Sequence, residues 1–181
     1  SKVSQGNHML TMNDLVGNNA VATWTNPSNP SDIVSFSVKK FNKINRLTDV
    51  NNDIFYNVEF GKVEEINYES VDGKIVQGWV VKPPQFDSKK KYPLVLRIHG
   101  GPHSMYNVGF NYNFQLHAAQ DQVVLYTNPR GSTGYGYDFA NAIQNAYPGN
   151  DYDDIMAGVD EIISRGYIDE NKMYVYGGSG G

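Results

Sequence analysis

The chain has 181 residues, and its 40% hydrophobic and 19% charged residues are typical of a folded globular protein and not of a disordered one. A formal net charge of −4, with a single run of lysines at 89–91, argues against nucleic acid as the main partner, because phosphate binding needs clustered lysine and arginine. No apolar run approaches the roughly 20 residues that a membrane span needs, and the absence of cysteine excludes disulfides and thiolate metal sites.

The first part of the chain, residues 1–55, has the pattern of short β-strands. Residues 20–25 (AVATWT) are rich in strand formers, residues 26–32 (NPSNPSD) are turn formers, and residues 33–38 (IVSFSV) alternate apolar with polar. This pattern predicts a hairpin. A hairpin alone cannot bury two faces, so we expect it to be the edge of a larger β structure that these residues do not complete.

A second hairpin is predicted from Glu64 onward. One strand runs to Val71, a second from Lys74 to Val81, and Asp72-Gly73 lies between them. An Asp-Gly pair between alternating strands predicts a two-residue turn in which both residues have positive φ.

The remainder alternates strands with a helix. Residues 94–98 (LVLRI), 122–127 (QVVLYT) and 172–176 (KMYVY) are short apolar runs of the kind buried in a parallel sheet. Residues 151–165 have helical spacing instead, with Asp151 as a cap and Gly166 as a stop. The expected apolar face consists of Tyr152, Ile155, Met156, Val159, Ile162 and Ile163. Strand, helix and strand with tight connections predict an α/β unit.

The last five residues, GGSGG (177–181), have two possible explanations. Gly/Ser runs form flexible linkers. The same residues also satisfy G-x-S-x-G, the turn that exposes a nucleophilic serine at the end of a sheet strand. Because they follow a helix, a polar turn and an apolar strand, we favour the nucleophile turn, with Ser179 at its apex. Glycine at Gly177 and Gly181 would then prevent clashes where the chain is crowded.

A glycine pair after an earlier strand supports this interpretation. His99-Gly100-Gly101-Pro102 follows residues 94–98, and hydrolases with this turn take one oxyanion-hole N–H from such a loop and another from the residue after the nucleophile. The backbone N–H groups of Gly101 and Gly180 are therefore the predicted oxyanion hole, and losing one such donor raises a reaction barrier by about 3 kcal/mol.

Four segments together resemble the prolyl oligopeptidase family of serine peptidases. They are IHGGPHS (98–104), NPRGSTGYG (128–136), DYDDIMAGVD (151–160) and YGGSGG (176–181), and they occur in the order and at the spacing of that family. The closest likeness is to its acylaminoacyl-peptidase and dipeptidyl-aminopeptidase branch. In other branches a tyrosine, whose hydroxyl serves as an oxyanion donor, stands where this chain has His99, so the Gly101 amide is the better candidate here.

The resemblance implies a domain organisation and a substrate class. Residues 1–55 would be the remnant of the last blade of a β-propeller. Residues 56–181 would be the N-terminal part of an α/β-hydrolase domain with a mixed, mostly parallel sheet. The substrates would be short peptides, and neither a metal nor an organic cofactor would be needed.

The triad of this fold follows the chain order Ser, Asp, His, so both partners of Ser179 are expected beyond Gly181. Without a base a serine hydroxyl is a poor nucleophile. We therefore expect the 181 residues alone to be inactive and to need the remainder of the protein to complete the fold. None of His8, His99, His103 and His117 stands in the right order to be the base. His99 is expected to shape the glycine loop, and His103 to lie at the rim of the site.

Several alternatives remain open. A carboxylesterase of the same fold, or a non-catalytic binding protein, would share the serine turn and the glycine loop. Arg130 could contact substrate, although we favour a role in holding its glycine-rich turn together. GSTGYG (131–136) is similar to a nucleotide-binding loop but lacks the required spacing. Three nearby carboxylates, Asp151, Asp153 and Asp154, could suggest a divalent metal, although a charged first helical turn explains them.

Overall fold

The structure is a computed structural model that describes residues 4–39, 43–101 and 103–181. It divides into two compact units. The first consists of Ser1–Glu59 with Asn107–Tyr112, and the second of Phe60–Tyr106 with Asn113–Gly181. The expected division into a propeller remnant (1–55) and a hydrolase part (56–181) stays a prediction.

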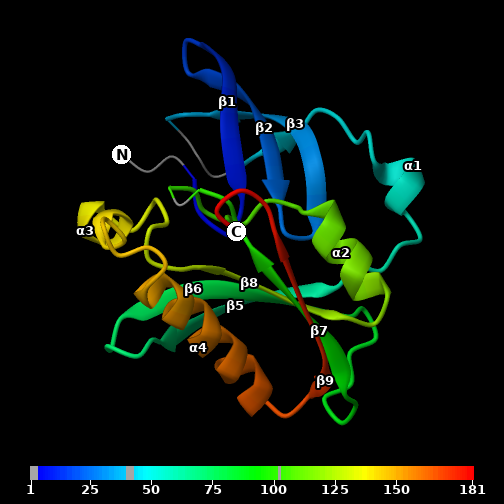
Figure 1. Ribbon diagram of the computed structural model, residues 1–181. Helices are drawn as coiled ribbons and strands as arrows, with labels where there is room; N and C mark the ends of the chain where they lie inside the picture. Colours follow the sequence, from blue (N-terminus) through cyan, green and yellow to red (C-terminus); the bar gives the residue numbers. More distant parts are fainter. Residues whose placement is uncertain (1–3, 40–42, 102) are drawn as a thin grey trace. The chain divides into compact units, whose positions relative to one another are not determined.

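The first unit contains an antiparallel sheet of four strands in the order β1-β2-β3-β4 (Figure 1). The strands are β1 (Met9–Val16), β2 (Asn19–Asn26), β3 (Asn29–Ser37) and β4 (Asn45–Arg46), and a short helix, α1 (Asn52–Phe55), follows them. The predicted hairpin is present as β2 and β3. Its expected seven-residue loop is wrong, because Asn26 pairs directly with Asn29 and leaves Pro27-Ser28 as the turn. The Asn26 side chain accepts hydrogen bonds from the backbone of Ser28 and the side chain of Asn29, which stabilises this tight connection.

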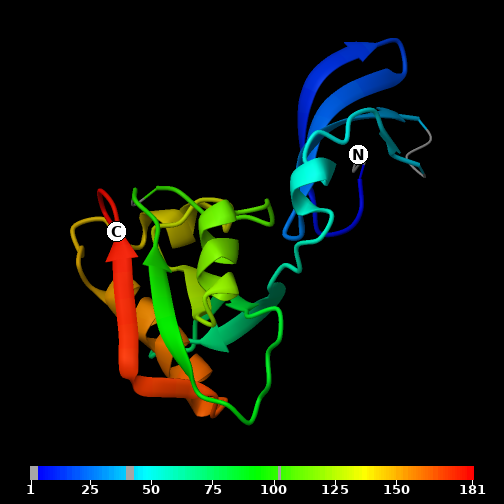
Figure 2. The ribbon, with the colours of Figure 1, turned by 90° about the vertical axis from the view of Figure 1, so that its right-hand side faces the viewer.

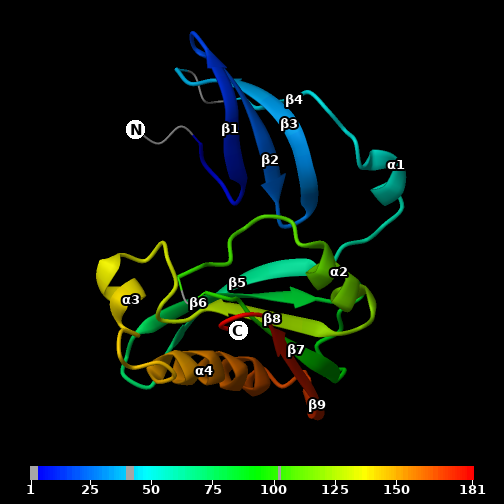
Figure 3. The ribbon, with the colours of Figure 1, turned by 45° about the horizontal axis from the view of Figure 1, so that its top comes forward.

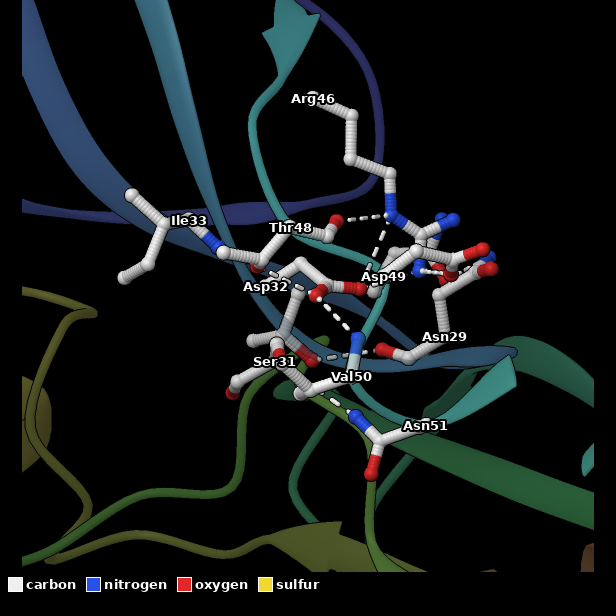
Figure 4. Close-up of polar contacts among 11 residues, drawn as sticks. Asn29, Ser31, Asp32, Ile33, Arg46, Thr48, Asp49, Val50 and Asn51 are labelled. Carbon is white, nitrogen blue, oxygen red and sulfur yellow. Dashed lines mark hydrogen bonds and ion pairs between the residues drawn. The ribbon is translucent and has the colours of Figure 1, made fainter. Parts of the chain in front are cut away.

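A buried carboxylate ties β3 to the chain after β4 (Figure 4). Asp32 is 2% exposed. Its Oδ1 accepts hydrogen bonds from the Thr48 hydroxyl at 2.6 Å and the Val50 amide at 3.3 Å, and its Oδ2 binds the Arg46 guanidinium. The Thr48 oxygen in turn accepts the Ile33 amide at 2.9 Å. Burial alone would raise the pKa of the Asp32 carboxyl, but hydrogen bonds from Thr48, Arg46 and Val50 outweigh burial and hold this pKa below its ordinary value.

This cluster predicts an acid-sensitive region. A carboxyl whose pKa is lowered by folding stabilises the folded state fully above its unfolded pKa of about 4, and that contribution is lost as the pH falls through the folded-state value. We expect hydrogen exchange of β3 and β4 amides, corrected for intrinsic rates, to accelerate selectively in acid. Asp32→Asn should flatten this dependence and weaken protection already at neutral pH. An unchanged pH profile in Asp32→Asn would show that other carboxyls are responsible.

The second unit is built on a mixed five-stranded sheet in the order β5-β6-β8-β7-β9. Its strands are β5 (Lys62–Glu69), β6 (Ile75–Lys82), β7 (Tyr92–Ile98), β8 (Val123–Asn128) and β9 (Ile168–Gly177). The α/β class and the mixed sheet agree with the sequence. The expected predominance of parallel pairing is not found among these five strands, because β6 pairs antiparallel with both β5 and β8, while β7 pairs parallel with both β8 and β9.

The turn between β5 and β6 differs from the predicted two-residue form. Glu69 pairs with Ile75, and the Ser70 amide donates to the Lys74 carbonyl at 2.8 Å, so three residues form the loop. Of the two predicted positions only Gly73 has positive φ, at 79°. This is a three-residue hairpin loop with glycine in the left-handed position, which an Asp-Gly pair also suits.

Two helices cover opposite faces of this sheet (Figure 3). The β7–β8 connection contains α2 (Tyr112–Ala119), and the β8–β9 connection contains α3 (Tyr137–Asn141) and α4 (Asn150–Ser164). Alternate residues of β8 face different helices. Leu125 belongs to the core that includes Val159 and Ile162 of α4, whereas Tyr126 packs its ring 4.5 Å from that of Phe114 on α2. The two crossovers start in opposite directions along the sheet, and right-handed connections then place their helices on opposite faces.

The predicted helix at 151–165 is α4, displaced by one residue. Ile155, Val159 and Ile162 are buried as expected, and Gly166 ends the helix with φ 83°. Tyr152 is wrong as a core residue, since it is 59% exposed. The helix instead directs Asp154 inward, toward a buried arginine. A periodicity based on apolar residues alone could not detect that position.

Strand β9 forms one edge of the sheet. The predicted strand 172–176 lies inside it, and the residues expected to turn the chain, 168–172, form its irregular beginning, where the pairing with β7 shifts between Tyr92 and Leu94. Within the described part of the chain, β9 pairs with β7 alone. Met173, Tyr174 and Val175 are 44% to 63% exposed.

Candidate active site

Three parallel strands, β8, β7 and β9, end at the same edge of the sheet. Figure 2 shows the arrowheads of β7 and β9 side by side at that edge. The segments that follow these strands are 129–136, 99–104 and 178–181. In open α/β sheets, ligands bind in the crevice outside the carboxyl ends of the strands, so this edge is the place to look for a site.

The predicted nucleophile, Ser179, stands in a strained turn directly after β9. Its φ is 60°, a left-handed conformation that is uncommon for residues other than glycine. The Gly181 amide donates to the Gly178 carbonyl at 3.1 Å and closes the turn around it. The serine is exposed. The final glycines therefore form a structured turn continuous with the sheet, which is not the behaviour of a flexible linker.

Nearby backbone atoms leave no room for a side chain at Gly177 or Gly181. A Cβ on Gly177 would overlap the backbone of Gly181, and a Cβ on Gly181 would lie 2.5 Å from the Ile98 carbonyl oxygen of the neighbouring strand. Real side chains do not approach backbone atoms so closely. A Cβ on Gly178, by contrast, would meet nothing within 4 Å.

This difference gives a matched pair of substitutions. We expect Gly177→Ala to displace the Ser179 turn and to lower the rate constant of a reaction at the Ser179 hydroxyl in the complete protein by about 10²-fold, the order of loss caused by small misplacements of reacting groups. Gly178→Ala should have a far smaller effect, because its methyl group enters open space. Steady-state kinetics of both purified proteins would measure the two effects. Equal losses in the two variants would contradict the steric explanation.

The glycine loop after β7 lies against the serine turn. A Cβ on Gly100 would lie 2.7 Å from the Gly178 carbonyl oxygen and 3.2 Å from the Ser179 Cβ, and one on Gly180 would lie 3.3 Å from the Gly101 amide nitrogen. The structure thus brings together Ser179, Gly101 and Gly180, the three residues predicted as the site. Pro102, which completes the predicted motif, lies outside the described residues. Among the residues that are described, neither the Gly101 amide nor the Gly180 amide donates a hydrogen bond.

The segment 129–136 supports the glycine loop from the other side. His99 Nε2 lies 2.9 Å from the hydroxyl of Ser132, which is fully buried, and His99 Nδ1 lies 2.8 Å from the Gly100 carbonyl oxygen. The Thr133 amide donates to the Ser104 carbonyl at 2.9 Å. His99 therefore shapes the loop, as predicted.

Arg130 anchors this supporting segment to the body of the unit. Its Nε and Nη2 donate to the carboxylate of Asp154 on α4 at 2.9 and 2.6 Å, and its Nη1 donates to Asp72 at 2.7 Å. Its backbone amide also donates to Asp154 at 2.8 Å. Hydrogen bonding to Asp154 raises the pKa of the guanidinium, and a smaller effect of the same sign comes from Asp72. Arg130 therefore holds its turn together, as favoured from the sequence, and its guanidinium is directed toward Asp154 and Asp72.

A hollow of about 380 Å³ adjoins the two loops and is lined by His103, Asn141, Ile143, Gln144 and Tyr147. One of its walls contacts the serine turn, because the Tyr147 hydroxyl donates to the Gly180 carbonyl at 2.6 Å. His103 is exposed, in agreement with a position at the rim, and its Nδ1 lies 3.1 Å from the Gly131 carbonyl oxygen. The lining residues carry no acidic or lysine side chain.

Two of the three carboxylates near the start of α4 have partners within the protein. Asp154 is bound to Arg130, and Asp151 accepts the Gly149 amide at 2.6 Å at the start of the helix. In the described part of the chain, no group of three or more His, Cys, Asp or Glu could hold a metal ion. Nor is any described helix both long and apolar enough to cross a membrane.

Sequence reasoning missed two residues that contact the predicted site. Ser132 and Tyr147 both reach it through single hydroxyl contacts from distant parts of the chain. Nothing in their local patterns marks them. Only the position of Ser132 within the family-like segment 128–136 could have suggested a role.

The sequence is similar to those of known peptidases. Residues 108–181 match the sequence model of the prolyl oligopeptidase family. The protein named uncharacterized peptidase YuxL of Bacillus subtilis is 43% identical over 162 residues, which make up 89% of this chain and 24% of that protein. Dipeptidyl-peptidase 5 of Schizosaccharomyces pombe is 37% identical over 121 residues, or 65% of this chain and 18% of that protein.

Solved structures show the same likeness. Acylaminoacyl peptidase of Pyrococcus horikoshii has a TM-score of 0.86 at 26% sequence identity, over 98% of this chain and 28% of the other. The chain thus spans between 18% and 28% of the length of these relatives.

Proposed function

The chain belongs to the prolyl oligopeptidase family, as its motifs predicted, and from that premise we propose that it carries the nucleophile and the oxyanion hole of a serine peptidase acting on short peptides. Ser179 attacks the scissile carbonyl. The Gly101 and Gly180 amides stabilise the negative charge that develops on the carbonyl oxygen. A histidine outside these 181 residues takes the serine proton, and an aspartate, also outside them, orients that histidine.

The reaction proceeds in two halves. The histidine passes the serine proton to the leaving amine as the carbon–nitrogen bond breaks, and the acyl group remains as an ester on the Ser179 Oγ. Water, deprotonated by the same histidine, then attacks this ester, and the histidine returns the proton to the Ser179 oxygen as the carbon–oxygen bond breaks and the acid is released. Both tetrahedral intermediates place their oxyanion between the same two amides. No step requires a metal or an organic cofactor.

One observation carries the proposal, namely the approach of the serine turn to the glycine loop. Gly100 could not carry a Cβ without striking the Gly178 carbonyl oxygen and crowding the Ser179 Cβ. Two loops packed so closely, with two amide donors left unused among the described residues, form a cradle suited to a small anion next to a hydroxyl.

Substrate preference tests this proposal against an esterase of the same fold. We expect the complete protein to hydrolyse aminoacyl- or peptidyl-anilides with a higher kcat/KM than short-chain esters of the same acyl group, once the intrinsic reactivity of the ester is taken into account. A fluorophosphonate should modify the peptide that contains Ser179. Rapid ester turnover with no detectable anilide hydrolysis would favour the carboxylesterase, and a protein that is neither labelled nor active would favour a binding role.

A further inference from the structure

Resting on the proposed function, we propose that the hollow beside the serine turn is a specificity pocket for an uncharged substrate side chain next to the scissile bond. Tyr147 is its specificity-determining residue, because it forms one wall of the hollow and also contacts the serine turn. The other lining residues are His103, Asn141, Ile143 and Gln144. None of them takes part in the chemical steps of the proposed reaction.

The hollow adjoins both proposed oxyanion donors. His103 follows Gly101 by two residues on the glycine loop, and the Tyr147 hydroxyl donates to the carbonyl oxygen of Gly180 at 2.6 Å. A substrate carbonyl that is held between the Gly101 and Gly180 amides is flanked by two residues, one that supplies the carbonyl and one that supplies the leaving nitrogen. Because the hollow borders both amides, a side chain that enters it belongs to one of these two residues.

The walls of the hollow are fixed at Gly131. His103 Nδ1 lies 3.1 Å from the Gly131 carbonyl oxygen, and a Cβ on Gly131 would lie 2.8 Å from the Ile143 Cδ1. Gly131 has φ 98°, and its amide donates to the Phe139 carbonyl at 3.0 Å. Walls that are held in place before a ligand arrives reduce the entropy lost on binding, and they favour side chains of a particular shape.

The lining favours an uncharged side chain. Its volume of about 380 Å³ lies in the range of about 300 to 1,000 Å³ that is usual for small-molecule pockets. Ile143 and the ring of Tyr147 supply apolar surface, and the Asn141 side chain donates to that of Gln144 at 2.8 Å. These five residues include no carboxylate, lysine or arginine. A charged substrate group would therefore lose part of its hydration here without gaining a counter-charge.

The Tyr147 hydroxyl connects the pocket with the serine turn. The Gly180 carbonyl and the Gly181 amide belong to one planar peptide, and that amide donates to the Gly178 carbonyl at 3.1 Å. Tyr147 therefore holds the same peptide that closes the turn around Ser179. A substrate side chain packed against the Tyr147 ring stabilises this contact, so selection is expressed in kcat as well as in KM.

Two substitutions at Tyr147 separate the hydroxyl from the ring. In the complete protein, Tyr147→Phe keeps the wall and loses the bond to Gly180. We expect it to lower kcat for all peptide substrates by about three- to tenfold, the size of one neutral hydrogen bond, without changing their order of preference. Tyr147→Ala also removes the wall, so the preference for leucine over alanine beside the scissile bond should fall by about tenfold in kcat/KM. Tyr152→Ala, similarly exposed but on α4 and outside the lining, is the control.

A charge at Gln144 gives a readout that a purely structural residue would not change. Gln144→Glu should raise kcat/KM for a lysine side chain, relative to leucine, by about three- to fivefold, the size of an exposed ion pair. It should lower the same ratio for glutamate, and Gln144→Lys should have the opposite effects. Internally quenched peptides, varied separately on each side of the scissile bond, would measure these ratios and identify which residue enters the hollow.

The outcomes separate this inference from the function on which it rests. If fluorophosphonate labels Ser179 of the wild type, but Tyr147→Ala keeps every preference, the inference alone is overturned. Gln144 variants that affect all substrates equally would also overturn it, and an unchanged kcat in Tyr147→Phe would remove the link to the serine turn. A wild-type protein without label on Ser179 would remove the proposed function, and the specificity pocket with it.

Discussion

Ser179→Ala is expected to lower kcat of the complete protein for peptide anilides by roughly a million-fold, the size of effect seen when a serine peptidase loses its nucleophile. This factor corresponds to about 8 kcal/mol of barrier. Covalent labelling by a fluorophosphonate should disappear altogether, because the label forms on the serine oxygen. The turn should survive, since Gly181 still donates to Gly178 and alanine is no larger than serine.

The measurement combines active-site labelling, followed by mass spectrometry, with anilide hydrolysis. A small residual rate is expected from the oxyanion hole alone. Ser104→Ala, on the glycine loop, is the control for nonspecific labelling of an accessible serine. Persistent labelling of the Ser179→Ala protein at another residue would assign the nucleophile elsewhere.

Arg130→Met is expected to cause the largest loss of stability in the second unit. The side chains of Arg130 and Asp154 are 4% and 0% exposed, so removing the guanidinium leaves a buried carboxylate without its counter-charge. Breaking such a pair costs about 3 to 5 kcal/mol. Hydrogen exchange of the amides of β8 and α4 should accelerate by roughly two to four orders of magnitude, if these elements open together.

A second substitution tests the cause. The double variant Arg130→Met/Asp154→Asn removes the buried charge. The asparagine oxygen can still accept the hydrogen bond from the backbone N–H of residue 130, so the double variant should recover a substantial part of the lost protection against hydrogen exchange. Asp72→Asn, which alters the exposed partner of Arg130, should have a much smaller effect. If the double variant exchanges as fast as Arg130→Met, the loss of stability comes from the lost packing of the arginine side chain and not from the unpaired charge of Asp154.

The sequence was informative where a local pattern has a single physical meaning. The apolar runs at 94–98 and 122–127 became β7 and β8, and the period of 151–165 became α4. The spacing of the glycines alone predicted crowding at Gly177 and Gly181. In the structure, backbone atoms occupy the space that a side chain at either position would need.

Other features depend on partners distant in the chain. Strand β1 was missed because most of its residues are exposed and show no alternation, although pairing with β2 fixes its register. The helices α2 and α3 are short, and α2 has little amphipathic pattern to detect. Asp154 looked like an ordinary carboxylate in a first helical turn, since nothing nearby in sequence reveals that Arg130 lies against it. For the same reason, Ser132 could not be connected with His99.

Strand β9 has a practical consequence for anyone who produces these 181 residues alone. Its outer backbone groups are unpaired within the described chain, and three neighbouring side chains, Met173, Tyr174 and Val175, remain largely in contact with water. Such an edge is a template for any extended polypeptide in solution, including a second copy of itself. Aggregation that increases with concentration is therefore the expected behaviour of the isolated chain, and covering this edge is a condition for handling it as a monomer.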